Sequence, residues 1–420
     1  MSEAQFLFGV ASVAALSGNA HDGIAVGQGE WQPTLRLPVQ MLWFPDGLIV
    51  ARAAPQHVDL LGARIVSVEG MTPERLMTYL RRVKGGKDAY LRWSSSWIIH
   101  SSEALHALGI ARRRDQMRLK LRLRDGRSVT HVLHSQPVPA SPPTLPPQRQ
   151  WMRDAWPEEA QYRWQSAIRS IPSPLYSQDQ DAWFRMRDLP ELDALYVQFR
   201  ANMDMEGAPI RPFVAQVRER LLTNAPVNLI LDLRMDTGGD NETNRALMRE
   251  IAQRVPGQIY VLIGSYTYSA GIASAAAIKH DGGQKVVLVG EEVADHLRFW
   301  SERALVCLPA SKICVKRNKG LWDLTRGCRL EPGCYGDKYD VTVRSLAPDI
   351  AAPITSRDWL QGNDPGLQAV IADVQRRKAV PAERRGGLKV PLPQKDRLTE
   401  LPPAAHNSSS TWAQPLRAGQ

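Results

Sequence analysis

The stretch 227-VNLILDLRMDTGGDNETNRALMREIAQRVPGQIYVLIGSYTYSAGIASAAAIKH-280 carries the clearest folding signal in this chain. It contains two apolar runs of strand length, residues 227–234 and 258–264. Between them, Leu247 and Ile251 recur at the spacing that places side chains on one face of a helix. A strand, a helix and a second strand in succession predict parallel strands joined by a right-handed crossover. We therefore expect an α/β fold built on a largely parallel sheet.

The same alternation continues on both sides of this stretch. Residues 194–200 and 285–290 are further predicted strands, and residues 211–222 repeat apolar side chains at helical spacing. In parallel sheets, functional side chains come from loops at the carboxyl ends of the strands. We therefore expect chemistry in two such loops, the Gly-Gly loop 235–244 and the Ser- and Tyr-rich loop 265–271.

The N-terminal part of the chain has a different pattern. Several segments alternate apolar and polar residues with the period of half-buried strands, and a helix begins at Pro73 between them. This order resembles a PDZ-like module. A proline-rich segment predicts a stiff linker, and the last residues, rich in Pro, Gly, Ser and charge, predict disorder. The predicted parts are an N-terminal helix (1–20), a PDZ-like β-rich domain (21–137), a linker (138–150), a catalytic domain (151–378) and a disordered basic tail (379–420).

Charge and hydropathy argue against nucleic-acid binding and against a membrane-spanning segment. The formal net charge of the 420 residues is +10, but residues 376–420 alone carry nine Lys and Arg against three Asp and Glu. The remainder is only mildly basic, whereas a nucleic-acid footprint needs charge clustered on a folded face. No apolar run approaches the length of a membrane span. We expect no nucleic acid and no integral membrane segment.

All four cysteines lie in one segment, at Cys307, Cys314, Cys328 and Cys334. Their gaps lack the short spacing that brings two thiolates onto one zinc ion, so two local disulfides are favoured over zinc, with the connectivity open. Disulfides require an oxidising compartment, which predicts export to the periplasm or beyond. The apolar residues 6–20 lack the preceding positive charge of a signal peptide, so they are interpreted as a packed helix, and whether the true start of the protein lies at Met1 or upstream stays open.

Four segments in fixed order carry a family resemblance. They are LILDLRMDTGGDNETN (229–244), YVLIGSYTYSAGIASAAAIKH (260–280), VVLVGEEVADHLRFWSE (286–302) and SLAPDIAAPITSRDWLQGNDPGLQAVIADV (345–374). Residues 190–376 resemble the catalytic domain of the C-terminal processing peptidases, or tail-specific proteases. The resemblance implies a ClpP/crotonase-like core, often with a PDZ-like domain, that cleaves polypeptide substrates with a serine nucleophile. It implies no metal and no organic cofactor.

The resemblance assigns roles to individual residues. It places the nucleophile at Ser269 and the oxyanion hole at the backbone N–H groups of Gly239 and Ala270. Asp236 stands where the family motif has Asn. By itself, a serine before a helix is more often an N-cap than a nucleophile, but a serine there also lies near free N–H donors that favour an adjacent oxyanion.

Two histidines are candidates for the general base. Bacterial members use a lysine where this chain has His296. The tricorn-like branch takes a histidine near the start of the peptidase region, and His21 has a similar setting, so the chain is nearer to that branch. A histidine base needs a carboxylate on its other nitrogen, and Glu302 and Asp295 are the candidates. We favour His21 over His296.

Three functions are compatible with these features. The first is a serine endopeptidase of the C-terminal processing type that forms an acyl-enzyme on Ser269. The second is a peptide- or ligand-binding scaffold that keeps the fold after losing its base. The third, acyl-CoA chemistry on a crotonase-like core, is disfavoured because such enzymes stabilise an enolate without a serine nucleophile.

Removing the residues after Lys378 is expected to leave folding and peptide hydrolysis unchanged, because their composition cannot bury a core. Thermal unfolding and kcat/KM on an unstructured peptide, compared between the full and truncated chains, check this. A truncated chain that unfolds earlier or hydrolyses more slowly would make the tail structural or substrate-binding.

Overall fold

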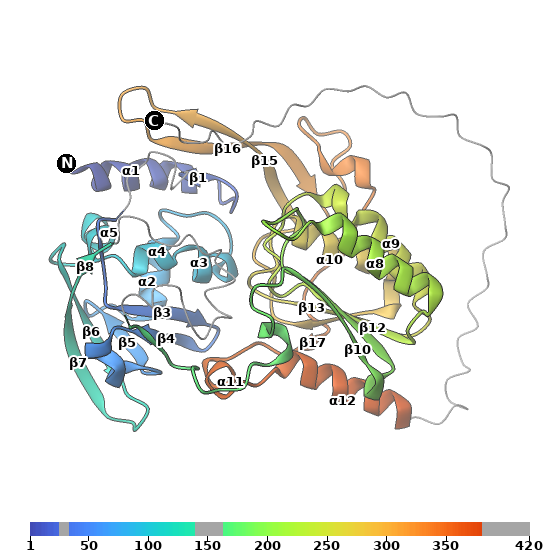
Figure 1. Cartoon of the computed structure of the whole chain (residues 1–420). Coiled ribbons are helices and arrows are strands. Elements are labelled where there is room, and N and C mark those ends of the chain that lie inside the picture. The colour runs from blue at the N-terminus through green and yellow to red at the C-terminus, as the bar shows by residue number, and fades with distance from the viewer. Residues whose placement is uncertain (25–32, 139–162, 380–420) are drawn as a thin grey trace. The chain divides into compact units, whose positions relative to one another are not determined.

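The computed structural model of the chain describes residues 1–24, 33–138 and 163–379. The predicted linker lies outside the described residues except for Val138, and the predicted tail does so except for Ala379. Residues 1–375 form one compact unit. This unit is a mixed α/β structure with several sheets (Figure 1). The division into domains at 21–137 and 151–378 stays a prediction.

The central sheet confirms the predicted parallel strands. Its order is β10-β11-β12-β13-β14-β17; β10 is antiparallel to β11, and every other neighbouring pair is parallel. The strands are β10 (Phe184–Leu189), β11 (Ala194–Phe199), β12 (Asn228–Asp232), β13 (Ile259–Ile263), β14 (Val286–Gly290) and β17 (Ile350–Ala351).

Helices cover both faces of this sheet (Figure 1). The helices α8 (Ile210–Thr223), α9 (Arg245–Arg254) and α10 (Ala270–Gly282) lie on one face, and α12 (Pro365–Ala379) lies on the other. Successive residues of β13 show why: Val261 packs into the cluster with α9, whereas Leu262 packs into the cluster with Val370 of α12. Because both faces are buried, the inner strands β13 and β14 consist almost wholly of apolar residues.

A second sheet, antiparallel, forms the N-terminal part. Its order is β3-β4-β5-β6-β7, with β9 also paired to β4. The β-rich pattern predicted here is therefore present, and the PDZ-like character stays an interpretation. The strands are β3 (Val39–Phe44), β4 (Gly47–Ala53), β5 (Arg64–Val68), β6 (Gln116–Arg122), β7 (Ser128–His134) and β9 (Gln165–Ser166), and β2 (Leu35–Arg36) pairs separately with β8 (Gln136–Pro137).

Short helices pack on this antiparallel sheet. The first, α1, buries Leu7 and Phe8, as expected for a packed N-terminal helix. The helices of this part are α1 (Glu3–Ala15), α2 (Pro73–Leu80), α3 (Asp88–Ser94), α4 (Ser96–Ile99) and α5 (Ser102–Ala107). The remaining elements are η1 (Pro55–Leu60), η2 (Leu175–Ser177), η3 (Pro190–Leu192), η4 (Asn241–Thr243), η5 (Gly283–Lys285), η6 (Gly336–Tyr339) and α11 (Ser356–Gln361). No helix in the described ranges is long and apolar enough to cross a bilayer.

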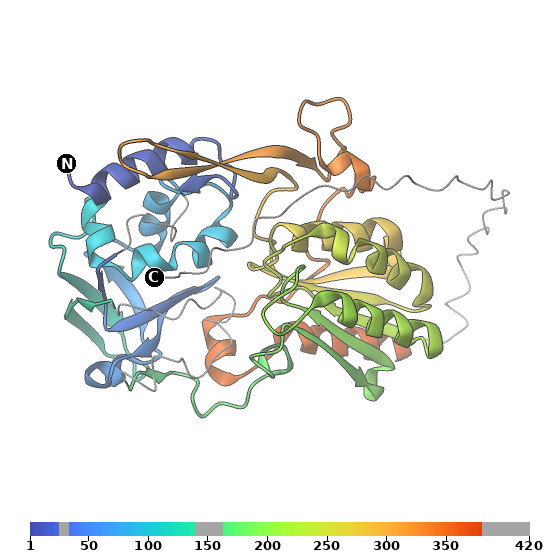
Figure 2. The same ribbon diagram turned by 45° about the horizontal axis from the view of Figure 1, so that its top comes forward.

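A long hairpin forms the third sheet. It consists of β15 (Arg298–Cys307) and β16 (Cys314–Asp323), and β1 (Gly23–Ile24) pairs with the outer edge of β16. The hairpin lies alongside α1 in both views (Figure 1, Figure 2). Residues from the start of the chain are therefore attached to an excursion inserted between β14 and β17 of the central sheet.

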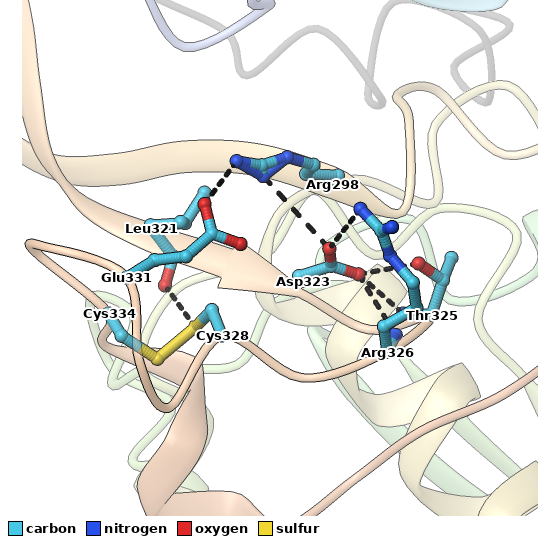
Figure 3. Close-up of a disulfide and its surroundings, with 8 residues drawn as sticks. All are labelled: Arg298, Leu321, Asp323, Thr325, Arg326, Cys328, Glu331 and Cys334. Atoms are coloured by element: carbon cyan, nitrogen blue, oxygen red, sulfur yellow. Dashed lines mark hydrogen bonds and ion pairs between the residues drawn. A yellow bond between two sulfur atoms is a disulfide. The ribbon is translucent and has the colours of Figure 1, made fainter.

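Both pairs of cysteines form local disulfides, as the sequence favoured. Cys307 and Cys314 are cross-strand partners at the tip of the hairpin, and Cys328 joins Cys334 in the loop after it. Figure 3 shows this loop. Its residue Glu331 pairs at 2.6 Å with Arg298, the first residue of β15. Because all four sulfur atoms are in disulfides, none is available to bind zinc.

A buried ion network fixes the end of β12. Arg234 pairs with Asp232 at 2.7 Å and with Asp364 at 2.6 Å, and Tyr196 donates its hydroxyl to Asp232. Burial alone would raise the pKa of Asp232, but the Arg234 charge and the hydrogen bonds lower it overall. The network joins the carboxyl end of the sheet to the loop before α12.

Replacing Arg234 with Met is expected to lower the free energy of unfolding by about 3 to 5 kcal/mol, because two buried carboxylates lose their cation. Arg81→Met is a matched control, since Arg81 makes a bidentate pair with Asp88 whose side chains are 50% and 43% exposed. That control should cost about 1 kcal/mol or less. Urea unfolding measures both, and equal losses would contradict the role of the buried network.

Candidate active site

Ser269 occupies a strained turn between β13 and α10. Its backbone has φ 55° and ψ −121°, a conformation that costs a non-glycine residue free energy. Its side chain makes no capping hydrogen bond to α10 and is partly exposed. The common role of a serine before a helix, the N-cap, is therefore not the role of Ser269. The turn instead presents its hydroxyl at the start of a buried helix.

Close backbone approaches hold this turn in place. A Cβ atom at Gly238 would lie 2.7 Å from the Cβ of Ser269 and 2.9 Å from the nitrogen of Ala270. A Cβ atom at Gly271 would lie 2.5 Å from the carbonyl oxygen of Asp236. The same carbonyl accepts the N–H of Tyr268 at 3.0 Å. The two loops predicted to carry chemistry therefore interlock, and glycine is required where they touch.

The two N–H groups expected to form an oxyanion hole are unused. Gly238 donates its N–H to Asp236 Oδ1 at 2.9 Å. By contrast, neither Gly239 nor Ala270 donates its N–H to an acceptor in the described part of the chain. Gly239 is exposed, and Ala270 opens the first turn of α10, where N–H groups have no partner within the helix. Both groups remain able to bind an anionic oxygen.

His21 lies beside the residue that precedes Ser269. Its ring stacks on Tyr268 with centroids 4.5 Å apart and on Phe299 at 5.2 Å. Its Nδ1 atom lies 3.5 Å from Oδ2 of Asp295, whose side chain is 1% exposed. Neither ring nitrogen of His21 donates to or accepts from a described residue. The ring is therefore fixed by stacking, with one nitrogen toward a buried carboxylate.

The other candidates lie elsewhere. His296 is exposed. Its backbone N–H donates a hydrogen bond to Asp295 Oδ1 at 2.8 Å. Glu302 accepts the hydroxyl of Ser301 at 3.0 Å, and no described contact joins it to His21. Lys279, on α10, donates to the Val286 carbonyl and pairs with Asp349. The structure thus brings the side chains of His21 and Asp295 together. His296 reaches Asp295 through its backbone N–H, and no described contact joins Glu302 or Lys279 to either residue.

Side-chain hydrogen bonds attach the segment around His21 to the hairpin. The Asn19 side chain donates to the carbonyl oxygen of Trp300 at 2.9 Å and accepts the Trp300 N–H at 3.2 Å, in the manner of a neighbouring strand. Asn318 donates to Asp22 at 2.6 Å. These bonds lie on both sides of His21 in the sequence, so they limit its movement relative to β15.

Sequence reasoning missed the support around His21. The stacking partners Tyr268 and Phe299 lie within the quoted family segments but were not assigned a role. A Gly-Gly pair at 85–86 is a signal that could have been used. A Cβ at Gly85 would lie 2.5 Å from the Asn19 carbonyl oxygen, and one at Gly86 would lie 2.6 Å from the Ala20 Cβ. Two glycines thus allow the His21 segment to approach.

Comparison with known proteins identifies a shared fold. No protein-family model matches the sequence, and no curated protein matches it. The structure of mature CPAF, a chlamydial serine protease, in complex with lactacystin matches with a TM-score of 0.55 at 12% identity, covering 88% of this chain and 87% of that chain. Mature CPAF alone gives 0.54 at 12% identity, with 90% of each chain covered.

The photosystem II D1 C-terminal processing protease also matches, at 12% identity over 86% of this chain and 83% of that chain, but its TM-score of 0.32 is too low to carry an argument. At such identities, structural similarity is evidence about architecture. The chain therefore has a mixed α/β fold of the kind found in CPAF.

Proposed function

We propose that this chain is a serine endopeptidase of the C-terminal processing type. The observation that carries the proposal is the pairing of an uncapped serine in a strained turn with a histidine stacked on the preceding residue and facing a buried carboxylate. In this proposal Ser269 is the nucleophile, His21 is the base, and Asp295 orients it. The fold shared with CPAF, a serine protease, supports the assignment.

The first half of the reaction forms an acyl-enzyme. His21 accepts the Ser269 hydroxyl proton as the oxygen bonds to the carbonyl carbon of the substrate. The carbonyl oxygen gains the negative charge and accepts hydrogen bonds from Gly239 and Ala270, which are preorganised and cost no rearrangement. When the carbon–nitrogen bond breaks, protonated His21 gives its proton to the leaving amine. Ser269 then holds the acyl group as an ester.

The second half repeats these roles with water. His21 takes a proton from a water molecule, whose oxygen attacks the ester carbon, and the same two N–H groups stabilise the second oxyanion. Collapse breaks the ester bond, and the Ser269 oxygen takes the proton back from His21. Asp295 faces Nδ1 of His21 and stabilises the imidazolium that forms in each half.

A histidine base agrees with the chemistry of the site. Imidazole changes its charge near neutral pH, so it accepts a serine proton without the large pKa shift that a lysine base needs. Asp295 faces Nδ1, which leaves Nε2 as the nitrogen for the serine. The branch of the family that uses histidine is therefore the one we propose. Two disulfides in a loop and hairpin favour an exported enzyme.

Ser269→Ala is expected to abolish hydrolysis of an unstructured peptide and covalent labelling by a fluorophosphonate, because both need the hydroxyl. Its folding should be unchanged, since the hydroxyl makes no capping bond. Mass spectrometry of the labelled wild-type chain should place the adduct on Ser269. Ser274→Ala, on the buried side of the same helix, is a control that should retain labelling. A wild-type chain that binds peptide without labelling or cleavage would indicate a scaffold.

His21→Ala and Asp295→Asn are each expected to lower kcat/KM by about 10² to 10⁴, since a serine hydroxyl without its base, or with a poorly oriented base, is a weak nucleophile. His296→Ala should cost little, because only its backbone N–H contacts Asp295. Steady-state kinetics on one peptide compares all three. A crippled His296 variant beside an active His21 variant would reverse the assignment of the base.

A further inference from the structure

Asp236 lies where the two loops of the candidate site interlock. It is fully buried. Its carboxylate oxygen Oδ1 accepts the N–H of Gly238, and its carbonyl oxygen accepts the N–H of Tyr268. A Cβ at Gly271 would lie 3.1 Å from its carboxyl carbon. One side chain therefore contacts both the loop that carries Gly239 and the helix start that carries Ala270.

Within residues 1–24, 33–138 and 163–379, no cation pairs with this carboxyl group. The groups that face it are Gly238 from its own loop, Asn202 after β11, and Tyr268 and Gly271 at the start of α10. None of these four carries a charge near neutral pH, and burial raises the pKa of the Tyr268 hydroxyl well above its ordinary value. Burial likewise raises the pKa of Asp236 to about 7, although the hydrogen bond from Gly238 favours its charged form.

A second buried aspartate in the same segment shows the contrast. Asp232 is also buried, but Arg234 pairs with it at 2.7 Å and holds its pKa low. Asp232 is therefore a structural carboxylate that stays ionised. Asp236, four residues later, has no such partner, so it changes its charge in the pH range in which a histidine-based peptidase works.

We propose that Asp236 is a positioning residue that must be uncharged for the oxyanion hole to work. This inference rests on the proposed peptidase function and adds a condition to it. An ionised carboxyl group beside Gly239 and Ala270 places a negative charge next to the developing oxyanion, in a buried region where screening is weak. It also competes for the N–H dipoles of the loop, because a carboxylate is the stronger acceptor. Ionisation of Asp236 thus switches off transition-state stabilisation without touching Ser269 or His21.

The pH dependence of kcat/KM between pH 5 and 9 tests the inference. In the wild-type chain kcat/KM should fall above about pH 7, by about tenfold per pH unit once the group is ionised. Asp236→Asn keeps an acceptor for Gly238 and stays neutral, so its kcat/KM should remain level to pH 9 while the acid limb is unchanged. Asp240→Asn changes an exposed carboxyl group of the same loop and should keep the wild-type profile.

A stability measurement gives a readout that is independent of turnover. The folded-state pKa of Asp236 is raised, so its contribution to stability is full below the unfolded pKa near 4 and is lost as pH rises through 7. The urea midpoint of the wild-type chain should therefore fall over this range more steeply than that of Asp236→Asn. Asp240→Asn should match the wild-type slope.

The outcomes separate this inference from the proposed function. A chain without Ser269-dependent hydrolysis overturns both. Ser269-dependent hydrolysis with the same alkaline fall in Asp236→Asn overturns only the role of Asp236. If Asp236→Asn fails to fold, the pH titration of the ¹³C resonance of the wild-type Asp236 carboxyl decides. A titration midpoint that coincides with the alkaline fall in kcat/KM supports the inference. A carboxyl group that is ionised throughout pH 5 to 9 overturns it.

Discussion

The contact between the Gly238 backbone and the turn at Ser269 is the constraint that organises the carboxyl edge of the central sheet. Thr267 strengthens it, because its hydroxyl donates to the Leu233 carbonyl at 2.8 Å and accepts the Gly264 N–H at 3.0 Å. These hydrogen bonds hold the loops after β12 and β13 against each other. A strained serine persists there because its surroundings determine its conformation from several sides.

Local periodicity was sufficient to predict four strands of the central sheet, β11 to β14, but not its outer strands β10 and β17. The strands β11 to β14 are buried on both faces and therefore apolar, which makes them visible in the sequence. The hairpin of β15 and β16 was not predicted. Its buried residues lie at the end away from the tip, where Phe299 and Ser301 of β15 alternate with less buried neighbours. Most of the remaining length is exposed, so strand periodicity gives only a short signal there.

The candidate site likewise has parts that the sequence indicated and parts that it did not. Ser269, Gly239 and Ala270 were assigned their roles by a family resemblance, which is readable because its motifs are continuous stretches of sequence. The sequence left two candidates, Asp295 and Glu302, for the carboxylate that would orient the proposed base. The backbone separates them: Glu302 has φ 61° within β15 and packs against Gly320, whereas Asp295 is buried in the loop after β14. No local pattern encodes that difference, and none encodes the stacking that holds His21.

The attachment of Asn19 to Trp300 joins positions 281 residues apart. During synthesis, the histidine emerges first, the serine much later, and the strand that fixes the histidine last. Loop closure over such a separation is slow compared with the formation of local structure. In the peptidase that we propose, nucleophile and base meet only in the finished fold, so the chain is inert while it is being made. In that proposal, the distance along the chain protects the nascent protein and its neighbours from premature cleavage.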